Sequence, residues 1–271
     1  MDTDILIAIP ARYASTRFPG KPLAKIAGKE MLIRVWEIAA KAAEGFSGCR
    51  AVIATEDERI VSFCQERNME CVLTSQSCKT GTDRVREVIS KLNISPRFIV
   101  NLQGDNPMCP PWFVKALIEA YTKDNALEVV TPCVRMSWEE LSQLRESKKL
   151  TPFSGTTAVV DKDGYAIWFS KNIIPALRKE DGLRESEEKS PVLRHVGLYG
   201  YSHKALDAFA SLPESYYEKL EGLEQLRFLE NGMKVKVVEV DYKGYGSMSG
   251  VDSPEDIIRA EALFAEHGEF V

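Results

Sequence analysis

Several residue types and patterns are scarce in this sequence of 271 residues, and their scarcity limits the possible functions. The chain has three histidines and six cysteines, the latter at positions 49, 64, 71, 78, 109 and 133 with no Cys-x-x-Cys pair. Zinc binding is therefore not indicated. A disulfide framework is not expected in a chain of this size without a secretory signal, so we expect free thiols in a reducing compartment.

Long apolar runs and clustered basic residues are missing as well. No apolar segment approaches the roughly 20 residues of a membrane-spanning helix. The opening Met-Asp-Thr-Asp and the short apolar stretch after it do not resemble a signal peptide. The net charge is −5, and the 35 lysines and arginines are spread along the chain. We therefore expect a cytoplasmic protein that binds neither membranes nor nucleic acid.

The first half of the chain alternates between strand-like and helix-like segments. Hydrophobic residues make up 44% of the chain and charged residues 28%, as in ordinary globular proteins. Strands and helices are expected in turn at Ile5–Ile9, Met31–Ala43, Arg50–Thr55, Asp57–Arg67, Glu70–Thr74, Asp83–Leu92, Phe98–Leu102 and Pro111–Tyr121. This rhythm predicts an α/β fold with a mostly parallel, doubly wound sheet, in which ligands bind beyond the carboxyl ends of the strands.

The second half has a more mixed pattern. Strands are expected at Leu127–Val134, Thr156–Val160, Tyr165–Ser170, His195–Tyr201 and Lys234–Val240, and helices at Lys204–Ser211, Leu220–Asn231 and Pro254–His267. The densely charged segment Arg178–Ser190 is interpreted as a mobile surface loop. No linker rich in Gly, Ser or Pro separates the halves, so we predict a single domain, residues 1–271, with a smaller mixed sub-region in its second half.

A loop rich in cations follows the first expected strand. It carries Arg12, Arg17 and Lys21, together with the hydroxyl of Ser15 and the flexible Gly20. Arginine forks bind two phosphate oxygens at once, and lysine supplies a point charge, so the loop suits a polyphosphate. It matches neither a Walker A loop nor a Gly-x-Gly-x-x-Gly turn. The alternative is a solvated loop in which proline and glycine only shape the turn.

Two aspartates are candidates for a magnesium site. Asp105 follows the fourth expected strand after a glycine, and Asp252 precedes the last expected helix. Ser253, Pro254 and Asp256 are explained as N-cap, N1 and N3 of that helix, which leaves Asp252 without a structural explanation. Carboxylates suit a hard cation, although Gly-Asp is also a common turn. Whether the two side chains converge does not follow from their spacing.

Six segments together resemble the family of CMP-Kdo synthetases, the 3-deoxy-manno-octulosonate cytidylyltransferases. They are Ile9–Leu23, Gly81–Arg84, Asn101–Pro107, Arg194–Tyr199, Leu223–Arg227 and Gly250–Asp256, in the family order and across nearly the whole chain. The resemblance implies a Rossmann-like nucleotidyltransferase fold and a homodimer. It also implies a Mg²⁺-dependent reaction of CTP with 3-deoxy-D-manno-octulosonate (Kdo) that gives CMP-Kdo and pyrophosphate.

The resemblance also implies roles by position. Residues 1–125 would bind CTP, and residues 126–271 would bind the sugar acid and form the dimer. The triphosphate is expected at Arg12, Ser15, Arg17 and Lys21, further nucleotide contacts at Arg84 and Gln103, and the metal at Asp105 and Asp252. The sugar acid is expected at Lys171, His195, Tyr199, Glu224 and Gln225. Of these residues, Arg12, Lys21, Asp105 and Asp252 are the expected catalytic ones.

The acceptor half departs from the family pattern at two places. Lys171 stands where the family usually has arginine, and Thr151–Thr157 differs from the usual Pro-Asn/His-x-Val-Lys pattern. Lysine cannot reproduce a bidentate grip on a carboxylate. An 8-amino analogue of Kdo or, less favoured, a sialic-type acid therefore stays open as the acceptor. A third hypothesis is a catalytically inactive regulator that binds nucleotides. The joint presence of Lys21, Asp105 and Asp252 argues against this hypothesis.

Overall fold

The fold is built on one large mixed sheet. The structure is a computed structural model that describes residues 3–14, 18–78, 80–245 and 250–271. The strands of the large sheet are β1 Ile5–Pro10, β4 Cys49–Thr55, β5 Cys71–Leu73, β6 Phe98–Asn101, β7 Val129–Ser137, β8 Thr157–Val160, β9 Ala166–Ser170, β10 Lys189–His195, β11 Tyr199–Ser202 and β12 Val235–Val240. A small separate sheet pairs β2 Lys25–Ile26 with β3 Lys29–Glu30.

Helices pack on the large sheet, and some of them lie beyond the strands of its second half. They are α1 Met31–Ala43, α2 Glu58–Gln65, α3 Gly81–Leu92, α4 Pro111–Lys123, α5 Trp138–Leu150, α6 Glu180–Ser186, α7 His203–Ser211, α8 Tyr216–Glu221, α9 Gln225–Glu230 and α10 Pro254–His267, with a short 3₁₀ helix at Lys21–Leu23. None of the helices in the described ranges is both long and apolar enough to cross a membrane.

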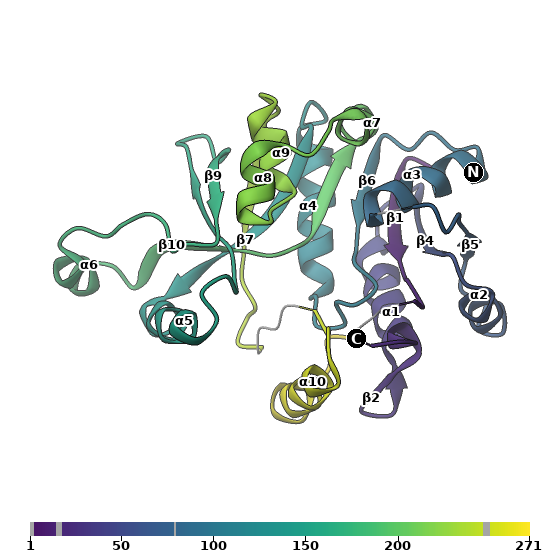
Figure 1. Cartoon of the computed structure of the whole chain (residues 1–271), viewed down its shortest axis with the longest axis horizontal. Helices are drawn as coiled ribbons and strands as arrows, with labels where there is room; N and C mark the ends of the chain where they lie inside the picture. Colours follow the sequence, from purple (N-terminus) through teal and green to yellow (C-terminus); the bar gives the residue numbers. More distant parts are fainter. Residues whose placement is uncertain (1–2, 15–17, 79, 246–249) are drawn as a thin grey trace.

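The two halves of the chain share the large sheet. Its strand order is β5-β4-β1-β6-β11-β7-β10-β8-β9, and β12 pairs with β7. The strands β5, β4, β1 and β6 are mutually parallel, whereas β11 runs antiparallel to both β6 and β7. Figure 1 shows the parallel strands of the first half on the right and the strands of the mixed second half to their left. The predicted α/β fold with a mixed sub-region is confirmed, and the pairing of β6 with β11 joins the two halves.

Strand β1 explains why the sheet is covered on both faces. All six of its residues are buried. Alternate side chains point to opposite faces, so Ile5, Ile7 and Ile9 pack with α1 and α4, while Leu6 and Ala8 pack with α3. Burying each large aliphatic side chain contributes about 1.5–3 kcal/mol. The strand is therefore held from both sides, and its carboxyl end presents the cation-rich loop at a fixed position.

Helix α5 is an element that hydrophobic periodicity does not predict. Only Leu141 and Leu144 of this helix are buried, so its apolar stripe is narrow. Its start is stabilised by a capping box, in which the Ser137 hydroxyl accepts from Glu140 N at 3.1 Å and the Glu140 carboxylate accepts from Ser137 N at 2.7 Å. The Ser-x-x-Glu spacing was the available sequence signal.

The prediction of a loop at Arg178–Ser190 is wrong, because this segment contains α6 and the start of β10. None of the α6 residues is buried. Instead, Glu180 accepts hydrogen bonds from the guanidinium groups of Arg145 and Arg184 at 2.7–3.0 Å, which lowers the pKa of Glu180 to about 2. Charge pairing stabilises this helix, and such pairing leaves no hydrophobic period in the sequence.

Two further predicted boundaries are also wrong. The expected helix Leu220–Asn231 is divided into α8 and α9 at Gly222, whose φ of 63° lies in the left-handed region that ends helices. The expected strand His195–Tyr201 is divided into β10 and β11. Residues 196–198 turn the chain from the β10 ladder to the β6–β7 ladder, so the segment changes partners within three residues.

Gly200 of β11 is a position where no side chain fits. A Cβ atom there would lie 2.2 Å from Cζ of Phe98, whose buried ring stacks on Tyr121 at 4.3 Å between centroids. We predict that Gly200→Ala lowers the free energy of unfolding by about 1–3 kcal/mol, because the packed ring has no space to move. Urea denaturation measures the change.

Gly182 supplies the matched control. A Cβ atom at Gly182 in α6 has no neighbour within 4 Å, so Gly182→Ala should leave stability equal or slightly higher. Equal stability of both variants would contradict the tight packing of β11 against Phe98.

Candidate active site

A lysine and two aspartates from three distant segments meet at the carboxyl edge of the sheet. The ammonium of Lys21 lies 2.8 Å from the Asp105 carboxylate and 3.2 Å from the Asp252 carboxylate. Lys21 belongs to the cation-rich loop after β1, Asp105 follows β6, and Asp252 directly precedes α10. The structure therefore brings together the two carboxylates whose spacing in the sequence left their convergence open.

Close backbone contacts fix this convergence. A Cβ atom at Gly104 would lie 2.6 Å from the Pro10 carbonyl oxygen, so only glycine lets the loops after β1 and β6 approach each other this closely. Val251 N donates to the Asp105 carbonyl at 2.7 Å. Asp256 accepts from Asp252 N at 2.9 Å and completes a capping box with Ser253, as predicted.

The donor set at this point fits a magnesium ion that is held together with phosphates. Asp105 and Asp252 offer hard carboxylate oxygens on either side of one ammonium group. Among the described residues, no group of three or more His, Cys, Asp or Glu side chains could hold a metal by itself. Mg²⁺ is usually bound by one or two carboxylates, with water and substrate phosphates as its other ligands. Asp105 and Asp252 are the residues that would hold it.

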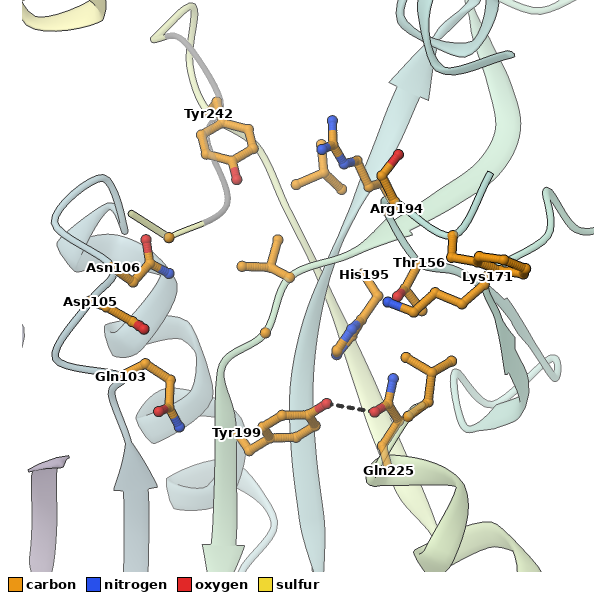
Figure 2. A pocket seen from close by; sticks show the side chains of 18 residues that line it. Gln103, Asp105, Asn106, Thr156, Lys171, Arg194, His195, Tyr199, Gln225 and Tyr242 are labelled. Atoms are coloured by element: carbon orange, nitrogen blue, oxygen red, sulfur yellow. Dashed lines mark hydrogen bonds between the residues drawn. The ribbon is translucent and has the colours of Figure 1, made fainter. Parts of the chain in front are cut away.

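A cavity of about 440 Å³ opens beside this cluster. Gln103, Asp105 and Asn106 from the loop after β6 line one side. Lys171, Arg194 and His195 face them from the second half of the sheet (Figure 2). Tyr199 and Gln225 close the lower end of the cavity in this view. The cavity thus lies where the parallel half of the sheet meets the mixed half.

The far wall of the cavity is positively charged. The side-chain nitrogens of Lys171 and Arg194 have no carboxylate partner within 4.0 Å among the described residues. Glu221 accepts from Lys171 N at 2.7 Å and from the Ser170 hydroxyl at 2.9 Å, which fixes the backbone under Lys171. Burial lowers the pKa of Lys171. Unpaired cations in a chain of net charge −5 indicate an anionic ligand.

The polar side chains at the lower end of the cavity are neutral. Burial, and then the charge of Lys171, lower the pKa of His195 to about 3. Its Nε2 atom lies 2.8 Å from the Thr131 hydroxyl. The Tyr199 hydroxyl donates to Gln225 Oε1 at 2.9 Å, and burial raises the pKa of Tyr199. This end of the cavity therefore offers hydrogen-bonding groups that carry no charge.

Comparison with known proteins assigns the chain to a family. A protein from Maricaulis maris named 3-deoxy-manno-octulosonate cytidylyltransferase is 43% identical over 98% of this chain and 99% of its own length. The chain belongs to the 3-deoxy-manno-octulosonate cytidylyltransferase family. The relative of that name from Syntrophotalea carbinolica is 41% identical over 95% of this chain and 97% of its own length. The sequence model of the broader family described as cytidylyltransferase matches residues 6–235.

Solved structures agree with this membership in the cytidylyltransferase family. The structure of a CMP:2-keto-3-deoxy-manno-octonic acid synthetase complexed with CTP is 34% identical, with a TM-score of 0.81 over 97% of this chain and 98% of that one. A cytidylyltransferase from Leptospira borgpetersenii is only 14% identical, with a TM-score of 0.60 over 97% of this chain and 87% of that one, and shows the fold alone.

Of the residues expected at the triphosphate, Ser15 and Arg17 lie outside the described residues. Arg12 donates to the Cys78 carbonyl at 3.0 Å and is exposed. Lys21 lies between Asp105 and Asp252. The assignment of these residues to CTP stays a prediction for this member of the cytidylyltransferase family.

Arg84 lies deeper than a residue expected to touch the nucleotide. It is fully buried, forms an ion pair with Glu56 at 3.0 Å and donates to the Thr74 hydroxyl. Glu56 in turn accepts from Tyr13 N at 3.1 Å and Ala14 N at 3.5 Å. In this family member Arg84 thus supports the carboxylate that anchors the start of the cation-rich loop, and a direct nucleotide contact stays a prediction.

Glu224 is also set back from the cavity. It is partly exposed, is not among the residues that line the cavity, and burial raises its pKa. Its neighbour Gln225 lines the cavity instead. A contact of Glu224 with the sugar acid of the cytidylyltransferase reaction stays a prediction.

Sequence reasoning missed several residues that line the cavity. Arg194 begins the segment Arg194–Tyr199 that resembles the family, directly before His195, and its charge was the signal that could have marked it. Thr156 and its neighbours in 153–155 line the cavity from the segment that departs from the family pattern. Tyr242 follows β12 and lines the opposite end, where no sequence signal marked it.

The neutral state of His195 has a measurable effect on stability. Since the folded-state pKa is about 3, the unfolded chain binds one proton more than the folded chain between pH 6.5 and 3. Stability is therefore lost as the pH falls through this window. Between pH 7 and pH 5, we predict that wild type loses about 2 kcal/mol more of its free energy of unfolding than His195→Gln does.

The measurement is urea denaturation of both proteins at several pH values. His267→Gln, at the end of α10 and away from the cavity, is the control and should keep the pH dependence of wild type. A parallel pH dependence of wild type and His195→Gln would show that His195 is not held neutral.

Proposed function

We propose that this protein transfers CMP from CTP to 3-deoxy-D-manno-octulosonate and releases pyrophosphate. The single observation that carries the proposal is the meeting of Lys21, Asp105 and Asp252 beside a cationic cavity. Family membership and likeness to a structure complexed with CTP support it. A cytoplasmic location follows as part of the proposal, because CTP is made inside cells.

The reaction needs positioning and charge neutralisation more than an activated nucleophile. The anomeric hydroxyl oxygen of the acceptor forms a bond to the α-phosphorus of CTP, the bond from that phosphorus to the bridging oxygen breaks, and the hydroxyl proton leaves to solvent. Negative charge grows on the departing pyrophosphate. Lys21 and Arg12 lie in the loop after β1, where their charges would stabilise it.

We also propose that Mg²⁺ is the cofactor. Bound by Asp105 and Asp252, it would supply charge stabilisation to the phosphate oxygens. Lys21 bridges the same carboxylates at 2.8 and 3.2 Å, so this ammonium would lie within reach of the phosphates that the ion would bring.

The cationic wall supports an acidic sugar as the acceptor. Lys171 and Arg194 would bind the acceptor carboxylate, and the neutral side chains below them would bind its hydroxyl groups. An 8-amino analogue is not favoured, because its ammonium would add a third positive charge near this wall. The names of the relatives also favour Kdo over the sialic-type alternative.

The reaction and the metal site are tested together. Wild type should release pyrophosphate from CTP only when Kdo and magnesium are present. Asp105→Asn and Asp252→Asn should each lower turnover by about a hundredfold or more, because each removes one charged magnesium ligand. The measurement is coupled pyrophosphate release at saturating and at limiting magnesium.

Asp207→Asn is the matched control, since Asp207 pairs with Arg86 at 3.2 Å and does not line the cavity. It should keep the activity of wild type. Near-normal turnover of either cluster variant at limiting magnesium would exclude the metal site, and absence of pyrophosphate release by wild type with Kdo would exclude the reaction.

We propose further that the active form is a homodimer. β9 is an edge strand of the large sheet, and its Ile167 is 59% exposed. On the neighbouring α8, Tyr216 is 67% and Leu220 is 65% exposed. Several large exposed apolar side chains around one sheet edge suit a contact with a second copy of the chain.

Ile167→Lys should therefore shift the protein toward the monomer without loss of folding, as measured by sedimentation velocity at micromolar concentrations. Ile258→Lys is the control, because Ile258 is 69% exposed on α10, an element that does not adjoin β9. A wild-type protein that sediments as a monomer would contradict the dimer.

A further inference from the structure

Thr131 connects two parts of the acceptor side that are separate in sequence. It lies in β7, and its side chain is fully buried. Its hydroxyl oxygen lies 2.8 Å from the Leu198 carbonyl oxygen and 2.8 Å from His195 Nε2. His195 ends β10, and Leu198 lies in the short turn before β11. No sequence pattern marked this threonine as part of the site.

The Thr131 hydroxyl has a single proton, and this determines the direction of both hydrogen bonds. A carbonyl oxygen can only accept, so the Thr131 proton must point to Leu198. The hydroxyl is then left with lone pairs toward His195, and the short contact to Nε2 requires a proton on Nε2. Because His195 is neutral, its other nitrogen, Nδ1, carries no proton and is a hydrogen-bond acceptor.

Nδ1 is available to a ligand. His195 lines the cavity, and within the described part of the chain Nδ1 has no hydrogen-bond partner. Nδ1 is also not among the buried atoms that lack a partner, so it is reachable from the cavity. Figure 2 shows the ring between Lys171 and Tyr199, turned to the open space.

We propose that Thr131 is a positioning residue that fixes His195 in its Nε2-protonated tautomer, so that Nδ1 accepts a hydrogen bond from a hydroxyl of the acceptor sugar. This inference rests on the proposed function, in that it takes the cavity to be the acceptor site. Thr131, which does not line the cavity, thereby becomes part of the proposed acceptor site. His195 is then a hydrogen-bond donor at Nε2 and an acceptor at Nδ1.

The same cavity also offers a hydrogen-bond donor, on Gln225. Gln225 accepts from the Tyr199 hydroxyl through Oε1, and this leaves its Nε2 buried and without a partner. Figure 2 shows that nitrogen directed upward from the lower end of the cavity. The cavity thus offers an acceptor at His195 and a donor at Gln225. A sugar hydroxyl can serve either one, whereas an ammonium group can serve only the acceptor.

Thr131 could also act only by holding the turn at Leu198, and the experiment separates the two roles. Thr131→Val keeps the shape but removes the hydroxyl, and Thr131→Ser restores it. Thr122→Val, which loses a hydroxyl bond to the Ile118 carbonyl on α4, is the control for removing such a bond elsewhere. The readouts are the ring ¹⁵N chemical shifts of ¹⁵N-histidine-labelled protein and the KM values for both substrates.

We expect the wild-type shifts to show His195 as the Nε2–H tautomer, with His195→Gln identifying its signals among the three histidines. Thr131→Val should mix the tautomers and raise the KM for Kdo about tenfold, the loss of one hydrogen bond, with the KM for CTP within about twofold. Thr131→Ser and Thr122→Val should behave as wild type in both readouts.

The proposal would be overturned if His195 of the wild type were the Nδ1–H tautomer. It would also be overturned if Thr131→Val changed only the ¹⁵N chemical shifts of His195, or only the KM for Kdo. The tautomer measurement uses no substrate, so it stands even if wild type fails to release pyrophosphate with CTP and Kdo. That failure would overturn the proposed function, and the acceptor role of Nδ1 with it, while leaving the tautomer assignment intact.

Discussion

The site depends on one electrostatic constraint, the placement of two carboxylates on either side of the Lys21 ammonium. The three groups come from three different segments, and backbone contacts hold the loops of Asp105 and Asp252 within reach of the Lys21 ammonium. Gly104 lets two loops touch, and the Asp105 carbonyl binds Val251 N. The carboxyl edge of parallel strands collects such loops at one place, which is why this edge binds ligands in doubly wound sheets.

The cavity wall that comes from the second half of the chain has a different physical origin. The antiparallel insertion of β11 between β6 and β7 places His195 and Tyr199, at the ends of consecutive strands, beside residues of the loop after β6. Sheet hydrogen bonding thus joins the edge that carries Lys21 and Asp105 to the cationic wall of the cavity. The cavity is formed where the direction of the strands changes.

Much of this arrangement could be predicted from the sequence, and the reasons for the failures are specific. Ile5–Ile9 was recognised because a doubly buried strand is continuously apolar, and Ser253 and Asp256 because capping follows a local rule. Helix α6 was missed because ion pairs with Arg145, a residue distant in sequence, stabilise it. Arg84 matched a family position, but only the fold shows that it faces Glu56. Thr131 has a role only through neighbours that adjoining strands bring to it.

The Arg84–Glu56 pair has a consequence for the energetics of ligand binding. Because Glu56 binds the backbone of Tyr13 and Ala14, and the Arg12 side chain binds the Cys78 carbonyl, the first residues of the cation-rich loop are ordered as the chain folds. Conformational entropy given up during folding is not given up again when a ligand arrives. The free energy of folding thus bears part of the cost of ordering this loop, and under the proposed function the affinity for the triphosphate would be higher by that amount.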